Sequence, residues 1–173
     1  MTDEELMSAI AKSNETAFKE LLDRYSKRVF AFAWRLCLDP QQAEDLTQDV
    51  FFKVWRNAAE WKPQAKLETW LYRVLYNRFI DTRRKAKGTT EELSDDIRSG
   101  DDTPEQALIK KSRERAVAAA VNALPDRQKE ALILCYYQGL TAKEAAEVLS
   151  VTQGALESLL FRARQTLKEQ LDV

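Results

Sequence analysis

The sequence predicts an all-α protein made of two small helical domains joined by a flexible linker, with a helix-turn-helix in the second domain. Of its 173 residues, 45% are apolar and only four are Gly and four Pro, a composition that fits small helical domains but not a large enzyme fold. A polar, acidic stretch without helical periodicity interrupts the chain around residue 95. On both sides of that stretch, apolar residues recur at helical spacing.

The charge distribution indicates where the domains end. Residues 86–112 carry a net charge of −3, whereas the long segments before and after them are close to neutral. We therefore expect a first domain over 1–86, an acidic flexible linker over 87–112 that leads into a helix, and a second domain over 113–173. The linker's negative charge has two open interpretations, a mimic of nucleic acid and a simple solvated tether.

Helical order is expected to resume just after the linker. Thr103 is a good N-cap, Pro104 suits the first helical position, and Gln106 completes a capping box. These residues predict a helix that runs to about Asn122.

In the first domain, the most informative predicted helix runs from Ala43 to Arg56. Helical spacing places its apolar side chains on one buried stripe: Ala43, Leu46, Val50, Phe51 and Val54. The opposite face is polar with one aromatic ring in its middle: Asp45, Gln48, Asp49, Phe52 and Arg56. Two interpretations of Phe52 stay open, packing under a neighbouring segment of the chain and a protein-binding face.

The next predicted helix, Leu67 to about Lys85, becomes strongly basic towards its end. Its apolar side chains are Leu71, Val74, Leu75 and Phe79, and a polar row on another side comprises Arg73, Asn77, Asp81 and Arg84. A local excess of positive charge suits a phosphate backbone, and a row of mixed donors and acceptors can read base edges. The alternative is a solvated helix end whose cations favour the helix dipole.

The second domain carries a helix-turn-helix pattern. A helix beginning near Leu124 is expected to continue through Tyr137 and to stop at Gly139 in a left-handed conformation. Thr141 and Glu144 then form a capping box, and the turn Ser150-Val151-Thr152 leads into a helix from Gln153 to Leu167.

The spacing of this motif has a physical reason. Ala146 is small where the two helices cross, Leu156 fills the space between them, and Ser150 stands in the turn where Gly is commoner. The second helix leaves polar side chains for DNA, among them Gln153, Glu157, Ser158, Arg162, Arg164 and Gln165. A plain helical hairpin could copy the apolar spacing, but it would not need the capped short helix and the three-residue turn.

Composition argues against several other classes of function. The chain has no His, so an imidazole base and a Ser-His-Asp triad are excluded, and its two Cys, Cys37 and Cys135, lie inside apolar runs that predict buried thiols. We therefore expect no enzyme activity, no metal and no other cofactor. Since no apolar run reaches membrane-spanning length and the first residues are acidic, we also expect no membrane insertion and a cytoplasmic location.

From about Ala17 to Leu167 the chain resembles the extracytoplasmic-function, or group IV, sigma factors of bacterial RNA polymerase. Three blocks match in the correct order: Ala43 to Trp55, Trp70 to Arg84, and Leu124 to Arg164. The resemblance implies a transcription initiation factor that binds core RNA polymerase, at the clamp of its largest subunit and at its flap. Such a factor recognises the minus-thirty-five and minus-ten elements of promoter DNA and promotes DNA melting.

The resemblance also implies which residues do this. The predicted polymerase-binding residues are Asp45, Gln48, Asp49, Phe52 and Arg56. The predicted minus-ten residues are Lys62, Gln64 and Lys66, near a pocket for a flipped base, and Arg73, Asn77, Arg78, Arg83 and Arg84. The predicted minus-thirty-five residues are Thr152, Gln153, Glu157, Ser158, Arg162 and Arg164. A separate anti-sigma factor is the implied regulator.

One departure from the family pattern affects the recognition helix. Many relatives carry basic residues where this chain has Glu157 and Leu159. A carboxylate can accept a hydrogen bond from the cytosine amino group, so one hypothesis is that Glu157 selects a cytosine while Arg162 holds the backbone.

Two other functions compete with initiation. A sigma-like decoy that sequesters an anti-sigma factor would explain the altered recognition helix, but it would not need Arg73, Asn77, Arg83 and Arg84. An ordinary helix-turn-helix repressor would explain residues 113–173 but not the first domain.

Overall fold

The computed structural model describes residues 1–86 and 105–171, and every regular element in these ranges is helical. The expected N-cap Thr103 and Pro104, and the acidic residues 87–102 of the expected linker, lie outside the described residues. The elements are α1 (Asp3–Ala11), α2 (Glu15–Cys37), α3 (Pro40–Asn57), η1 (Ala58–Glu60), α4 (Leu67–Ala86), α5 (Glu105–Asn122), α6 (Asp126–Leu132), η2 (Ile133–Tyr137), α7 (Ala142–Leu149) and α8 (Gln153–Leu171).

Side-chain caps define the helices of the first half. The Thr2 hydroxyl accepts from the Glu5 backbone N–H while the Glu5 carboxylate accepts from the Thr2 N–H, which is a capping box. Asn14 caps α2 through Ala17 N–H, and Asp39 caps α3 with Pro40 at the first helical position. Neither α1 nor α2 was predicted from the sequence.

The predicted stripe of α3 is confirmed. Its five apolar side chains are all buried, and they pack mainly against α2, the longest helix of this half. The α4 side chains Leu71, Leu75 and Phe79 are buried as expected, whereas Val74 is only partly buried. Together these contacts close a core around Phe32, which is fully buried on α2.

The helix-turn-helix of the second half is also confirmed. Thr141 and Glu144 form the predicted capping box, and Ser150 adopts a left-handed conformation with φ 56°. Both Ala146 and Leu156 are buried where α7 meets α8. Helix α8 extends to Leu171, four residues beyond the predicted end.

The helix before this motif ends in an unexpected way. Helix α6 passes into the π-helical turn η2, where Gln138 N–H donates to Ile133 O at 3.0 Å. Gly139 then takes a left-handed conformation with φ 74°, as predicted, and the Leu140 N–H donates a hydrogen bond to Leu134 O. The wide turn leaves Tyr136 and Tyr137 exposed.

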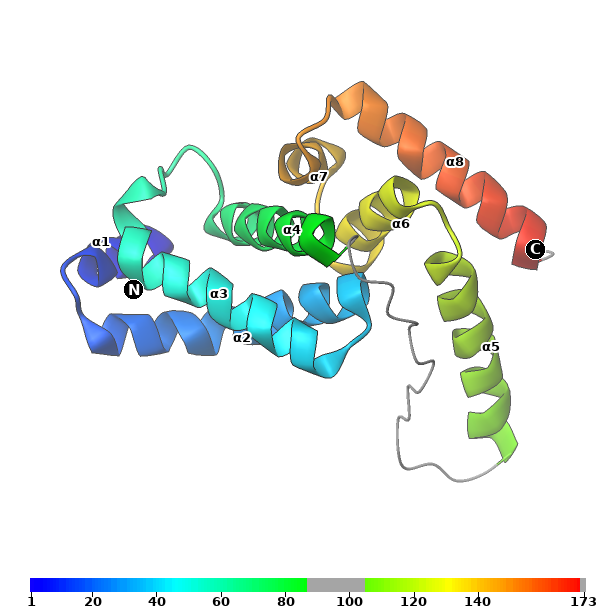
Figure 1. Cartoon of the computed structure of the whole chain (residues 1–173), viewed down its shortest axis with the longest axis horizontal. Helices are drawn as coiled ribbons and strands as arrows, with labels where there is room; N and C mark the ends of the chain where they lie inside the picture. Colours follow the sequence, from blue (N-terminus) through cyan, green and yellow to red (C-terminus); the bar gives the residue numbers. More distant parts are fainter. Residues whose placement is uncertain (87–104, 172–173) are drawn as a thin grey trace.

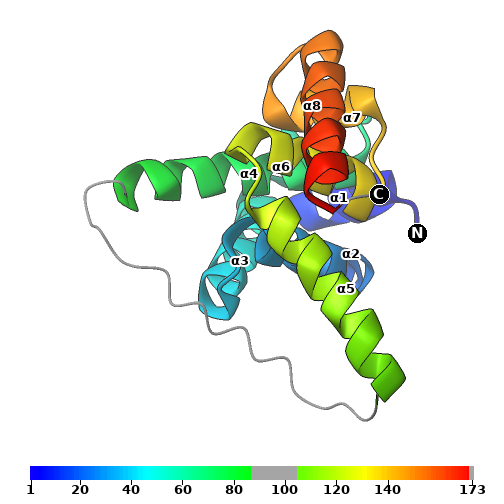
Figure 2. The same cartoon turned by 90° about the vertical axis from the view of Figure 1, so that its right-hand side faces the viewer.

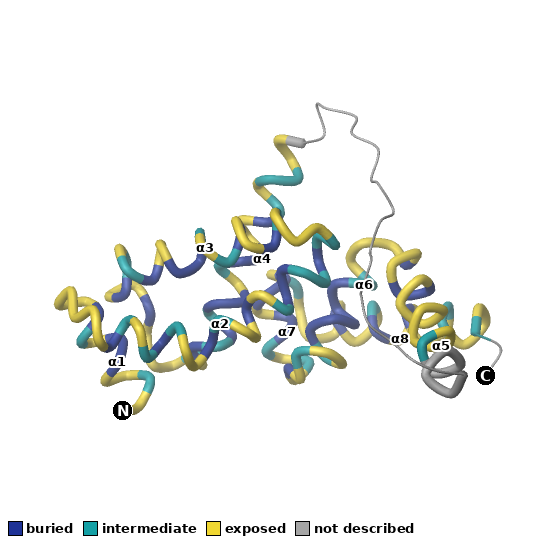
Figure 3. The backbone as a smooth tube through the Cα atoms, turned by 90° about the horizontal axis from the view of Figure 1, so that it is seen from below, coloured by how far each residue is buried: buried dark blue, intermediate teal, exposed yellow. Residues whose placement is uncertain are grey.

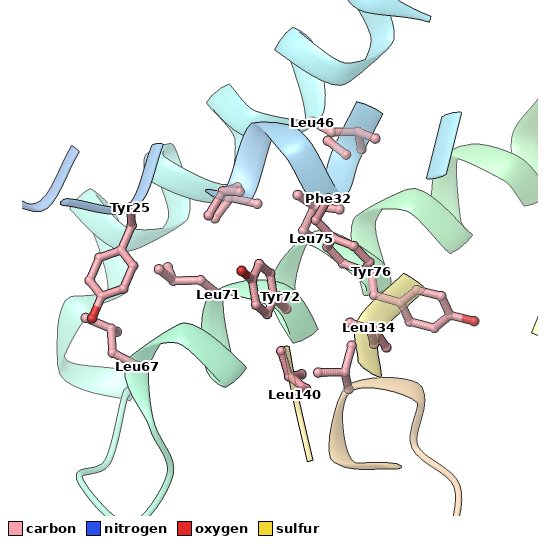
Figure 4. Close-up of a cluster of buried hydrophobic side chains, with 14 of the residues drawn as sticks. Tyr25, Phe32, Leu46, Leu67, Leu71, Tyr72, Leu75, Tyr76, Leu134 and Leu140 are labelled. Carbon is pink, nitrogen blue, oxygen red and sulfur yellow. The ribbon is translucent and has the colours of Figure 1, made fainter. Parts of the chain in front are cut away.

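The two halves share one apolar core, which the sequence did not lead us to expect. Helix α4 lies between α3 on one side and α6 and α7 on the other (Figure 1). Figure 4 shows Leu71, Tyr72 and Leu75 of α4 grouped with Leu134 and Leu140 of the second half. The expected domain boundaries stay a prediction, but the described parts of the two regions are packed together.

Helix α5 is different from the other long helices. It projects from the rest of the molecule (Figure 2), and most of its described side chains are exposed (Figure 3). Its end is attached through Val121, which packs with Leu124, Leu132 and Ala163 in a small second cluster.

The expectation that both thiols are core residues is wrong. Both thiols are only half-buried and pack against the margin of the core; Cys37 is the last residue of α2, and Cys135 lies within the turn η2 beside the exposed Tyr136. The Cys37 Sγ donates to Ala33 O at 3.0 Å, and burial raises the pKa of both thiols.

None of the helices in the described ranges could span a membrane. Within the same residues, no group of three or more Cys, Asp or Glu is placed to hold a metal ion.

Candidate polymerase and nucleic-acid interfaces

The polar face of α3 presents its aromatic ring to solvent. Phe52 is 60% exposed, so the interpretation that it packs under a neighbouring part of the chain is wrong for the described residues. Asp45, Gln48 and Arg56 are on the same face, and the Arg56 guanidinium lies 5.7 Å from the Phe52 ring centre. An exposed ring flanked by charged groups is typical of a protein-binding surface.

The fifth residue of this face links it to α4. The Asp49 carboxylate accepts from Arg78 Nε at 2.9 Å. The two helices border a groove of about 360 Å³ whose lining includes Phe52, Arg56, Asn77 and Asp81. From the sequence these side chains were expected on separate polymerase and DNA surfaces, but the structure brings them together around one groove.

The predicted polar row of α4 is on the surface. Arg73, Asn77, Asp81 and Arg84 are all exposed, on the side away from the buried Leu71 and Leu75. Since this row continues from the α3–α4 groove towards the basic end of the helix, it forms an extended polar strip.

The loop before α4 is held in a defined shape. Trp61 is buried, and its indole N–H donates to Ala65 O at 3.1 Å. A second groove, of about 480 Å³, is lined by Gln64 and Lys66 and by Asp3 of α1. Lys62 is exposed but does not line it.

Two of the predicted minus-ten residues are paired with the second half of the chain. Lys66 Nζ lies 3.4 Å from Glu144 of α7. Arg83 forms ion pairs with Asp126 and, at 3.5 Å, with Glu130 of α6. Lys66 and Arg83 thus differ from Arg78, whose ion pair with Asp49 lies within the first half.

Glu130 is the most buried carboxylate of this contact between the halves. It is only 3% exposed, and the Tyr76 hydroxyl donates to its Oε2 at 2.7 Å. Burial raises the pKa of Glu130, although the Tyr76 hydrogen bond and the Arg83 charge act in the opposite direction. Two side chains of the first half, Tyr76 and Arg83, therefore contact this one buried carboxylate of the second half.

The recognition helix α8 leaves its predicted contacts exposed. Gln153, Glu157 and Arg162 face solvent together with Ser158, and Gln153 Nε2 donates to Glu157 Oε1 at 3.2 Å. Thr152 is exposed too, but its hydroxyl caps α8 by accepting from Ala155 N–H.

Arg164 is partly committed to another contact. Its Nε donates to the Tyr136 hydroxyl at 2.7 Å, and its guanidinium lies 5.4 Å from that ring centre. Sequence reasoning missed Tyr136, Glu130 and Glu144 as partners of the predicted residues. Of these three, only Tyr136 could have been suspected from the sequence, since it is one of two adjacent tyrosines at the end of a predicted helix. Glu130 and Glu144 could not, because acidic residues on predicted helices are ordinarily solvated.

Comparison with known proteins shows which family the chain resembles. Residues 21–89 match Sigma-70 region 2, and residues 114–167 match Sigma-70 region 4. The ECF RNA polymerase sigma factor SigK of Mycobacterium sp. is 30% identical over 171 residues, which cover 96% of this chain and 89% of that protein. The ECF RNA polymerase sigma factor SigE of Mycolicibacterium smegmatis is 33% identical, over 90% of this chain and 62% of its own longer sequence.

A solved structure has the same fold. The sigma factor RpoE of Bartonella quintana, crystallised with the anti-sigma factor NepR, superposes with a TM-score of 0.72 at 28% identity, covering 90% of this chain and 97% of that one. The chain belongs to the extracytoplasmic-function family of RNA polymerase sigma factors. It is a transcription initiation factor, as the sequence resemblance implied.

Proposed function

We propose that this chain binds core RNA polymerase through the polar face of α3 and recognises and melts the minus-ten element with α4 and the loop before it. The observation that carries the proposal is Phe52, a large apolar ring that is 60% exposed in the centre of a charged face. The groove between α3 and α4 supports it, because Phe52 and Arg56 of the proposed polymerase-binding face line it together with Asn77 of the proposed minus-ten residues.

We further propose that α8 reads the minus-thirty-five element in duplex DNA. Arg162 would hold the phosphate backbone, and the hydrogen-bonded pair Gln153 and Glu157 would face base edges. With the Gln153 amide already donating to it, the Glu157 carboxylate keeps further acceptor sites for a cytosine amino group.

The remaining parts of the proposal concern regulation and location. An anti-sigma factor would cover the polymerase-binding face, because the RpoE of B. quintana was crystallised in complex with one. The protein would act in the cytoplasm and would have no catalytic activity of its own.

Run-off transcription with purified core enzyme tests initiation directly. The expected result is a promoter-specific transcript that depends on this chain, since a decoy or an ordinary repressor would give none. Absence of a transcript, together with tight binding of an anti-sigma factor, would favour the decoy.

The polymerase-binding face has a matched test. Phe52→Ala should weaken binding to core polymerase by roughly 10- to 100-fold, because interface aromatic residues often contribute that much. Phe30 is an exposed aromatic residue on α2 and serves as the control. If Phe52→Ala and Phe30→Ala weakened binding to core polymerase equally in a competition assay, the polar face of α3 would not be the polymerase-binding face.

The base-reading role of Glu157 is tested by selection from a duplex library. Glu157→Ala should relax the preference at one base pair by about 10-fold, whereas Glu169→Ala, an exposed acid on the same helix, should not. An unchanged base preference in Glu157→Ala would show that Glu157 reads no base.

A further inference from the structure

Arg164 differs from Arg78 and Arg83 because its hydrogen-bond partner is a neutral phenol. Arg78 and Arg83 are paired with carboxylates, whereas Arg164 Nε donates to the Tyr136 hydroxyl at 2.7 Å. The residues three and four positions away from Arg164 on α8 include no acid. Among the side chains that the structure describes, no carboxylate pairs with Arg164, so its positive charge stays available to an anion.

The contact between Tyr136 and Arg164 leaves hydrogen-bond donors on both side chains. The guanidinium uses its Nε–H for the phenol, and the N–H groups of its two Nη atoms have no partner among the described side chains. The Tyr136 hydroxyl accepts from Arg164 and keeps its own hydrogen to donate. Since Tyr136 is 59% exposed and Arg164 is exposed as well, both sets of donors can reach an anion in solvent.

Tyr136 also fixes the position of the guanidinium. The central carbon of the Arg164 guanidinium lies 5.4 Å from the centre of the Tyr136 ring, which adds a cation–π contact to the hydrogen bond. A long side chain that is already held in the free chain loses less rotamer entropy when it binds a ligand. Arg164 is therefore better prepared to bind an anion than an arginine that moves freely in solvent.

The π-helical turn η2 presents Tyr136 to α8. Ile133 and Leu134 of the same turn are buried, whereas Tyr136 points outward and meets Arg164, 28 residues further along the chain. Short π-helical turns inside helices recur at functional sites. The position of Tyr136 at such a turn is thus a second reason to ask what this tyrosine binds.

Arg164 lies on the side of α8 that carries the proposed base-reading residues. Gln153 precedes Glu157 by four residues, and Glu157 precedes Arg164 by seven, spacings that keep the three within about 40° of one another around the helix. At about 1.5 Å per residue, Arg164 is about 16 Å beyond Gln153 along the axis. The major groove is only about 12 Å wide, so Arg164 reaches the phosphate backbone at its edge when Gln153 faces the bases.

We propose that Tyr136 and Arg164 together bind one phosphate group of the minus-thirty-five duplex. The Tyr136 hydroxyl donates to one phosphate oxygen, the Arg164 Nη atoms donate to another, and the phenol holds the guanidinium in place. The resemblance assigned Arg164 to DNA but gave no role to Tyr136. The inference rests on the proposed function, because it requires that α8 read the minus-thirty-five element.

The first test compares two neighbouring tyrosines in holoenzyme assembled from the full-length chain and core polymerase. Tyr136→Phe removes the hydroxyl and keeps the ring. The control is Tyr137→Phe, since the Tyr137 ring lies against Arg35 and its hydroxyl has no hydrogen bond among the described side chains. The probe is a fluorescein-labelled promoter duplex that supports run-off transcription, and its anisotropy is measured at a temperature too low for melting.

Tyr136→Phe should bind this duplex about fivefold more weakly than Tyr137→Phe does, the size expected for a lost hydrogen bond to a charged group. On the same duplex cut just downstream of the minus-thirty-five element, the two variants should bind equally. Equal affinities of the two variants for the uncut duplex overturn the proposal. A fivefold difference that persists on the cut duplex also overturns it, because a general loss of structure would act in that way.

The second test asks whether Tyr136 acts together with Arg164. Arg164→Ala should weaken binding about tenfold and lower the slope of log affinity against log salt concentration by about one, because one phosphate contact is lost. Adding Tyr136→Phe to Arg164→Ala should cause little further loss. Independent, additive losses would show that the two side chains do not share a phosphate.

The wild-type holoenzyme separates failure of this inference from failure of the proposed function. If it binds the uncut duplex more tightly than the cut one, the minus-thirty-five role of the second half stands, and the tyrosine variants then decide the inference alone. If it binds both duplexes equally, the proposed reading of the minus-thirty-five element fails, and the phosphate site fails with it.

Discussion

The two surfaces proposed to contact DNA are available to different degrees in the free chain. On α8, Gln153, Glu157 and Arg162 are exposed, and the hydrogen bond between Gln153 and Glu157 stays within the helix. At α4, Lys66 and Arg83 are paired with carboxylates of the other half. Among the residues that the structure describes, the proposed minus-thirty-five residues Gln153, Glu157 and Arg162 form no hydrogen bond or ion pair with the first half, whereas two of the proposed minus-ten residues are paired with carboxylates of the second half.

The strongest way to break this comparison is to damage the contact between the halves. Tyr72 is fully buried, its ring centre is 5.1 Å from that of Phe32, and its hydroxyl accepts from Gln138 at 3.1 Å. Tyr72→Ala should lower the free energy of unfolding by about 4 kcal/mol, measured by urea denaturation. Tyr72→Phe, which loses only the hydroxyl, should cost about 1 kcal/mol. Similar losses in the two variants would argue against a packing role for the ring.

A substitution inside the helix-turn-helix should affect one surface alone. Leu156 is fully buried between α7 and α8, so Leu156→Ala should cost about 3 kcal/mol through the cavity that it leaves. Loss of duplex binding is expected together with retained binding to core polymerase. If polymerase binding fell equally in a pull-down with folded protein, the two surfaces would be coupled more tightly than we infer.

Substituting Ala for the two glycines on either side of α7 should change the stability of the protein in opposite directions. Gly139 has φ 74°, so Gly139→Ala should cost about 1 kcal/mol although its added Cβ would meet no atom within 4 Å. Gly154 lies in the first turn of α8, also with open space around it, and Gly154→Ala should stabilise by about 0.5 kcal/mol. Thermal unfolding measures both, and a destabilised Gly154→Ala would point to a close approach at this turn.

The smallest expected effect is a difference in how two carboxylates at the contact between the halves, Glu130 and Glu144, make the free energy of unfolding depend on pH. Burial raises the pKa of Glu130 above its ordinary 4.5. Its contribution to the free energy of unfolding is therefore present below pH 4.5 and is lost as the pH rises through the raised pKa. For Glu144 burial also acts to raise the pKa, but hydrogen bonds from Thr141 and Lys66 outweigh it and lower the pKa. Its contribution is present above pH 4.5 and is lost as the pH falls.

Stability curves against pH for Glu130→Gln and Glu144→Gln check this pair of signs. Relative to wild type, Glu130→Gln should gain stability as the pH rises above 4.5. Glu144→Gln should instead lose less stability than the wild-type protein does when the pH is lowered. Parallel curves for the two variants would contradict the opposite shifts.

Local features could be predicted from the sequence because short-range physics determines them. The stripe of α3, the Thr141 capping box and the left-handed Gly139 each depend on residues within one or two helical turns. The place of Phe52 on the polar face followed from the same spacing, because its position is opposite Val50 and Val54 on any α-helix.

The contact between the halves could not be predicted in this way. Tyr76 meets Glu130 from 54 residues away, and Thr69 meets Glu144 from 75 residues away, distances over which helical periodicity carries no information. In the sequence, Glu130 looks like an ordinary helix acid, and Arg83 looks like a free cation. The π-helical turn at Ile133–Tyr137 also has no local signature, since its residues are apolar and favour an α-helix equally well.

The shared core has a consequence for synthesis of the protein. Tyr72 leaves the ribosome 66 residues before Gln138, its partner in the other half. At roughly 5–20 residues per second, the apolar side of α4 waits about 3 to 13 seconds for its covering helices. During that interval the nascent chain lacks the second-half partners of Tyr72 and Tyr76, so co-translational capture by a chaperone or by core enzyme would act on an uncovered first half.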